Sequence, residues 1–152
     1  MIDFYALDSN FSIGEEMMSV LNEIMEIMED HDLEVTVNKN IVIGLHSRIP
    51  IALKVYVGRR KASIELEAEE DLRDVLDELV EAGEDIASLV DDVLSELRDI
   101  AIEIGKALEN KGYRVELNLR EGENDVRDIV EEVTEEYEEI LEEELGIGEE
   151  EF

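Results

Sequence analysis

The spacing of hydrophobic and polar residues changes along the chain and divides it into helical and strand segments. Residues 13–28 place apolar side chains three or four positions apart, the spacing of one helix face, behind the capping sequence SIGE at 12–15. From residue 33 the period falls to two, as in half-buried strands. Four strands are predicted, and residues 2–7 are a candidate fifth; the four are 33–37, 41–46, 49–57 and 62–68.

The second half of the chain returns to helical spacing. Helices are predicted over residues 72–80, 86–108 and 125–145, with one short strand at 113–119. The pattern predicts an α+β fold: an antiparallel sheet of about five to six strands, with three to four helices packed mainly on one face. A single domain is expected over 1–152, because no linker-like composition interrupts it. The acidic end, about 146–152, is predicted to be disordered.

Two segments resemble each other at an offset of 80 residues. The sequences MEDHDLEVTVN (28–38) and LENKGYRVELN (108–118) share glutamate, valine and asparagine at matched positions. Each is predicted to be a helix end, a turn and a strand of equal length. The likeness fits either an internal duplication or a shared local architecture.

Charge then limits the classes of partner. The chain has 152 residues, 44 of them acidic against 13 lysines and arginines, and a net charge of −31. Such a charge repels nucleic acid and anionic membranes, so neither is an expected partner. With no cysteine and no glutamine, no targeting sequence and no long apolar run, the composition predicts a cytoplasmic protein from a thermophilic or high-salt archaeal-type source.

One long segment, residues 35–64, contains no aspartate or glutamate. Thirty residues of average composition would hold about nine acids. Strands select against acidic residues and buried faces exclude charge, so this segment is predicted to form the centre of the sheet. The acids then belong to the outer faces of the helices.

The same segment holds six of the thirteen basic residues. Lysines at hairpin tips also discourage sheet-to-sheet aggregation. Two functional interpretations remain open beside that one. In the first, the positive turns contact acidic helices of the same or a second chain. In the second, they bind a small anion; the residues predicted for this anion site are Arg48, Arg59, Arg60 and Lys61.

Catalytic motifs are not found. Without cysteine there is no thiol chemistry, and no Gly-rich phosphate loop occurs. His46 and Ser47 are adjacent on a predicted strand and therefore point to opposite faces, which opposes a serine–histidine pair. One cluster of carboxylates with an imidazole could hold a divalent cation; its residues are Glu26, Asp30, His31 and Asp32. No other cofactor is predicted.

The strand 49–57 carries mildly polar residues behind its apolar ones: Pro50, Ala52, Lys54 and Tyr56. A half-apolar second sheet face favours a homodimer. In size, acidity and expected fold the chain resembles small acidic dimeric export chaperones, without a shared motif. The favoured function is therefore a non-catalytic, chaperone-like or adaptor homodimer that binds another protein. The alternatives are a small-anion binding module around Arg59–Lys61 and an acid–base enzyme using His46.

Overall fold

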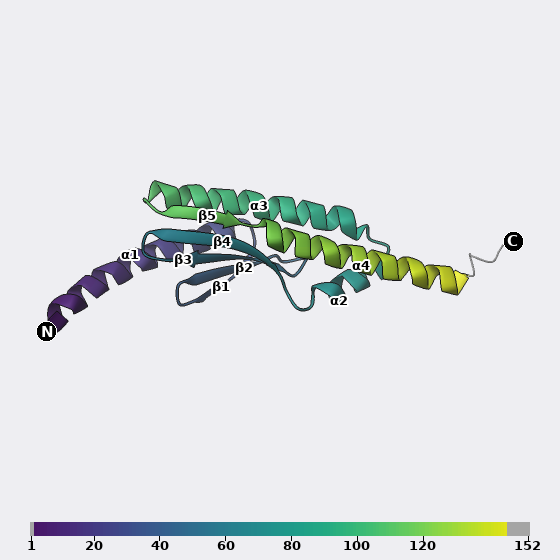
Figure 1. The fold of residues 1–152 in the computed structure, drawn as a ribbon, viewed down its shortest axis with the longest axis horizontal. Helices are drawn as coiled ribbons and strands as arrows, with labels where there is room; N and C mark the ends of the chain where they lie inside the picture. Colours follow the sequence, from purple (N-terminus) through teal and green to yellow (C-terminus); the bar gives the residue numbers. More distant parts are fainter. Residues whose placement is uncertain (1, 146–152) are drawn as a thin grey trace.

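The structure, a computed structural model, describes residues 2–145 and the side chains of residues 14–143. This part of the chain forms four helices and five strands (Figure 1). The helices are α1 (Ile2–Asp30), α2 (Leu72–Glu81), α3 (Ile86–Asn110) and α4 (Arg120–Leu145). The strands are β1 (Glu34–Asn38), β2 (Ile41–Leu45), β3 (Ile51–Val57), β4 (Lys61–Ala68) and β5 (Arg114–Asn118). The predicted α+β class is confirmed, while the predicted disorder of 146–152 lies outside the described residues.

The five strands form one sheet in the order β1-β2-β3-β4-β5. Each of the first four strands pairs in antiparallel orientation with the next one in the chain, whereas β5 pairs with β4 in parallel. A parallel neighbour cannot be reached through a tight turn, so the chain leaves the sheet after β4, forms α2 and α3, and returns beside β4. The sheet is therefore antiparallel with one parallel edge.

The strand register sorts the side chains onto two faces. Val35, Gly44, Leu53 and Leu66 form one cross-strand row. Because side chains alternate along a strand, the parallel row through Val42, Val55 and Ile64 lies on the same face. We call this side the core face, since its central residues are fully buried in the hydrophobic core.

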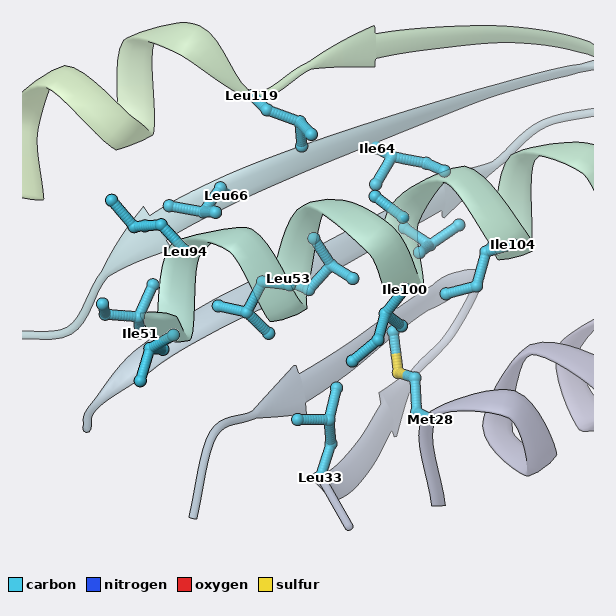
Figure 2. Close-up of a cluster of buried hydrophobic side chains, with 14 of the residues drawn as sticks. Met28, Leu33, Ile51, Leu53, Ile64, Leu66, Leu94, Ile100, Ile104 and Leu119 are labelled. Carbon is cyan, nitrogen blue, oxygen red and sulfur yellow. The ribbon is translucent and has the colours of Figure 1, made fainter. Parts of the chain in front are cut away.

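Two long helices cover the core face. Leu94, Ile100 and Ile104 of α3 point toward the sheet, and Met28 of α1 closes the core beside them (Figure 2). Each of these side chains is almost completely buried, so each contributes roughly 1.5–3 kcal/mol to folding. The apolar stripe of α3 that the sequence predicts is thus the central element of the core.

The few cations between the helices hold α4 in place. Arg98 of α3 donates two hydrogen bonds to Glu123, and Arg127 of α4 donates to Asp91 of α3. Arg73 of α2 bridges two carboxylates farther along α4. The Arg127 and Arg73 pairs are exposed and contribute about 0–1 kcal/mol each. Glu123 is buried, so Arg98 supplies the partner that its carboxylate needs away from water. The pairs orient α4, while apolar burial supplies most of the energy.

The N-terminal prediction is wrong. Residues 2–7 do not form a strand, and the capping sequence at 12–15 lies inside α1. A capping box acts only where the chain upstream is not helical, and here a helix is already formed. Helical spacing was present in the sequence, since Phe4, Leu7 and Phe11 lie three and four positions apart. The last helix also begins earlier than predicted, at Arg120 rather than about residue 125.

The repeated segments at 28–38 and 108–118 share one geometry. The amide of Leu33 donates to the carbonyl of Met28, and the amide of Tyr113 donates to that of Leu108, closing both helices in the same way. The residue just before each donor has positive φ, 63° at Asp32 and 92° at Gly112. This closure is common at helix ends, so shared architecture accounts for the likeness without a duplication.

Gly122 marks the closest approach between α4 and the sheet. A Cβ atom at this position would lie 1.8 Å from the carbonyl oxygen of Leu66 in β4. Neither backbone can move without disturbing α4 or the β4 edge, so only glycine fits. The contact fixes α4 against the part of β4 that extends beyond β5.

Gly122→Ala is expected to lower the free energy of unfolding by about 1–3 kcal/mol, because the new methyl group forces the α4 and β4 backbones apart. Gly14→Ala is the matched control: Gly14 is also helical, has nothing within 4 Å of its Cβ position, and should be neutral or stabilising by up to about 1 kcal/mol. Denaturant unfolding measures both. Equal stability of the two variants would contradict the close contact.

Candidate functional site

The sheet has a second face, here called the open face. Its larger aliphatic and aromatic side chains stay partly exposed and do not join the hydrophobic core that α1 and α3 cover, whereas the small Ala52 among them is buried; the larger ones are Ile41, Ile43, Leu45 and Tyr56. Ile41 pairs across the strands with Tyr56, and Leu45 with Ala52. The result is an apolar strip along the middle of the sheet.

The open face is nearly neutral, unlike the rest of the molecule. Along the five strands its positions hold three cations and four carboxylates: Lys54, Lys61, Arg114, Glu34, Glu65, Glu67 and Glu116. The chain as a whole carries −31. Most of the negative charge therefore lies on the helices, away from this face.

Lys54 lies at the centre of the open face and forms an ion pair with Glu67 of β4. The hydrogen bond to this carboxylate raises the pKa of Lys54 above its ordinary value of 10.5, although partial burial acts in the opposite direction. Lys54 also lies directly opposite Glu65 in the register. Its charge is thus neutralised within the face, which leaves the neighbouring strip apolar.

Six of the thirteen cations gather at one end of the sheet, here called the basic end: Lys39, Arg59, Arg60, Lys61, Lys111 and Arg114. The connections β1–β2, β3–β4 and α3–β5 meet there (Figure 1). The amide of Val57 donates to the carbonyl of Asn40, and Lys61 pairs with Arg114 in the register. Three turns far apart in sequence are therefore held side by side.

A cleft of about 720 Å³ opens at the basic end between α1, the β3–β4 turn and the α3–β5 connection. We call it the basic cleft. Its lining residues are Glu16, Met17, Ser19, Val20, Arg59, Arg60, Lys111, Gly112 and Tyr113. It thus combines three cations with an apolar wall, and it draws residues from three separate elements.

The structure brings only part of the predicted anion site together. Arg59 and Arg60 line the basic cleft, whereas Lys61 turns to the open face, 3.7 Å from Glu116. Arg48 lies in the β2–β3 connection, at the opposite end of the strands. Sequence reasoning missed Lys111 and Tyr113, since their approach to the β3–β4 turn depends on the parallel pairing of β5 with β4.

The cations of the cleft differ in their partners. Lys111 contacts Glu23 of α1 at 3.1 Å. Among the side chains that the structure describes, no carboxylate lies within ion-pair distance of Arg59 or Arg60. With respect to side chains 14–143, the two guanidinium groups are therefore available to an incoming anion.

A larger hollow, about 930 Å³, runs along one side of α1. Its described lining comes from that helix alone, and its charged groups are Glu15, Glu23 and Glu26. Residues from separate elements do not converge there, as they do in the basic cleft. It is therefore the weaker candidate.

The four residues predicted for the cation site lie at the C-terminal end of α1 and just after it. No group of three or more histidine or acidic side chains in residues 14–143 is arranged to hold a metal ion. Of the set Glu26, Asp30, His31 and Asp32, His31 instead contacts Glu103 of α3 at 2.9 Å. Asp32 occupies the left-handed position that ends α1.

His46 is buried, with 8% of its surface exposed, and both ring nitrogens have partners. Nδ1 accepts the amide hydrogens of Arg48 and Ile49, at 3.1 and 3.4 Å. An accepting Nδ1 places the proton of the neutral ring on Nε2, which lies 3.0 Å from Glu96 of α3. The ring shapes the β2–β3 connection and fastens it to α3, a structural role.

None of the described helices combines the length and the apolarity needed to cross a membrane. Comparison with known proteins gives no match: no family model fits the chain, no curated protein is similar to it in sequence, and no solved structure matches it. Function is therefore inferred from the two surfaces described above, the open face and the basic cleft.

His46→Ala is expected to destabilise the fold by about 1–3 kcal/mol, because two amides of the β2–β3 connection lose their acceptor. His31→Ala removes the exposed pair with Glu103 and should cost about 0–1 kcal/mol. Thermal and denaturant unfolding compare the two. A larger loss at His31 than at His46 would contradict these assignments.

Lys54→Met is expected to reduce the loss of stability at alkaline pH. A pKa raised by folding means that the Lys54 contribution is complete below pH 10.5 and disappears as the pH rises through the folded-state value. Wild type should therefore lose more stability than Lys54→Met between about pH 9 and pH 12. Urea unfolding across this range measures the difference. If the free energy of unfolding fell equally in both proteins as the pH rose, titration of Lys54 would not contribute to stability.

Proposed function

We propose that this protein is a non-catalytic interaction module that associates with a second copy of itself through the open face. The supporting observation is the apolar strip around Ile43, which is partly exposed and is bounded by a nearly neutral set of charges. Removing the exposed part of this apolar surface from water lowers the free energy.

A second copy is the partner that the charges favour. In a two-fold contact the same patch faces itself, so apolar strip meets apolar strip and the three cations can face four carboxylates. A helix-to-helix contact would instead bring two strongly acidic surfaces together. Self-association through the sheet therefore joins two molecules of charge −31 with little repulsion at the contact itself.

The size of the face sets the expected strength. Five strands about 4.8 Å apart and roughly 17–25 Å long offer an area on the order of 400–500 Å² per partner. This is the low end of specific interfaces, which bury about 800 Å² per partner when stable. We therefore expect a reversible dimer, in the micromolar rather than the nanomolar range.

Salt dependence distinguishes this contact from another mode of self-association. If the basic end of one copy met the acidic helices of another, added salt would weaken the complex. In an open-face dimer the attraction is apolar and the residual force is repulsion between two negative molecules. Added salt should then strengthen it.

Ile43→Glu is expected to weaken the dimer at least about tenfold, since it places a charge at the centre of the proposed contact. Ile102→Glu is the matched control, because Ile102 is 39% exposed on α3, away from the open face. Sedimentation equilibrium at several concentrations, in about 0.1 and 1 M NaCl, should give twice 17.3 kDa for wild type and the control.

A wild type that stays at 17.3 kDa at every concentration would overturn the proposal. So would an Ile43→Glu variant that dimerises as well as wild type. Dissociation by salt would instead support contact between the basic end and the acidic helices. Circular dichroism of both variants verifies that each is folded.

A further inference from the structure

The basic cleft has features that self-association through the open face does not require. Its two arginines occupy the tip of the β3–β4 turn, and the turn is held on both sides. The amide of Gly58 donates to the carbonyl of Lys61 at 2.7 Å, and the carbonyl of Arg60 accepts the amide of Arg114 at 2.9 Å. The second bond ties the turn to β5, so the arginines project from a fixed backbone.

The charge of the cleft is opposite to that of the molecule. Its lining holds Arg59, Arg60 and Lys111 against the single carboxylate of Glu16, and Glu23 offsets Lys111. The two guanidinium groups have no carboxylate partner among the described side chains. They therefore give the cleft a local excess of positive charge, although the net charge of the chain is −31. This local excess attracts an anion, whereas the whole-molecule field repels one.

A phosphate group matches this arrangement better than a carboxylate does. It carries about −1.5 to −2 at neutral pH and presents three oxygens, enough for two adjacent guanidinium forks. A carboxylate has two oxygens, so two bidentate arginines would have to share both, whereas on a phosphate they share only one. The number and type of cations therefore favour a terminal phosphate.

The remaining wall of the cleft is apolar. Met17, Val20 and Tyr113 line it and also pack against the hydrophobic core. A volume of about 720 Å³ exceeds what one phosphate fills and lies within the range of about 300–1,000 Å³ typical of small-molecule sites. The cleft thus has room for an organic body next to the anionic group.

A small ligand also fits the electrostatics better than a polymer does. A nucleic acid would bring many phosphates within a Debye length, about 8 Å at physiological salt, of the acidic helices. A monoester brings one phosphate, and that phosphate lies against the cations. Repulsion therefore selects for a compact anion.

We propose that the basic cleft binds a small organic phosphate, with the phosphate held by Arg59 and Arg60 and the apolar or aromatic part of the ligand packed on Met17, Val20 and Tyr113. This site is independent of the open face. Lys111, already bonded to Glu23, contributes charge at the edge of the site.

The test uses the full chain and three probes: phenyl phosphate, inorganic phosphate and phenol. Phenyl phosphate combines an anionic group with a ring, and the other two supply each part alone. The cleft variant is Arg59→Gln with Arg60→Gln, and the matched control is Arg48→Gln with Arg120→Gln, which removes the same charge outside the cleft. All samples are held at one ionic strength with NaCl.

Phenyl phosphate at ten times its Kd should raise the Tm of wild type and of the control pair by about 3–6 °C. Inorganic phosphate should bind at least about tenfold more weakly, and phenol should have no effect. The cleft variant should lose at least about tenfold in affinity for phenyl phosphate, measured by titration calorimetry.

Equal affinity of the cleft variant and the control pair for phenyl phosphate would overturn the site. Equal binding of inorganic and phenyl phosphate would overturn the organic part of the ligand. Ile43→Glu should still bind phenyl phosphate, and the cleft variant should still dimerise. Failure of one proposal therefore leaves the other standing.

Discussion

Parallel pairing of β5 with β4 requires the chain to leave the sheet at one end of β4 and to re-enter at the other. The connection is long enough to form α2 and α3, and its return places α3 antiparallel to β5 across the core face, where Leu94, Ile100 and Ile104 fill the core (Figure 2). The same pairing sets Arg114 beside Lys61 and brings the α3–β5 connection to the β3–β4 turn. The core and the basic cleft both depend on this one strand contact.

Charge is distributed so that a chain of −31 can still fold around an aliphatic core. Carboxylates on outer helix faces remain in water, where screening limits their mutual repulsion. The sheet, which must exclude charge from its buried side, has no acid between Val35 and Ile64. As a consequence the two surfaces with little negative charge, the open face and the basic end, are both built from the sheet and its turns, and these are the surfaces to which we assign binding.

The two surfaces are compatible with each other. The apolar strip of the open face lies along the middle of the sheet, and the cleft lies at the end of the sheet, behind the β3–β4 turn and against α1. A dimer formed through the sheets would leave the clefts at the ends of the assembly. His46, which the sequence offered as a candidate acid–base residue, accepts two amides of the β2–β3 connection at Nδ1 and contacts Glu96 of α3 through Nε2.

Local patterns in the sequence determined most of the elements. Period-two segments predicted the four antiparallel strands, and helical spacing predicted α2 and α3, because those periods reflect which side of an element faces the core. The acid-free segment identified the central strands, and the polar residues behind β3 identified a face without full cover. These features are local, so the sequence carries them directly.

Only the tertiary structure decided the strand order, the parallel edge and the composition of the cleft. Lys111 and Tyr113 lie about fifty residues from Arg59 in the chain, and no local pattern indicates that they meet. Arg48 has the same sequence signature as Arg59, yet it lies at the far end of the sheet because successive turns of a meander alternate between ends. Sequence spacing fixes the direction of each side chain within its own element, whereas contacts between elements follow from strand pairing and from the burial of their shared core.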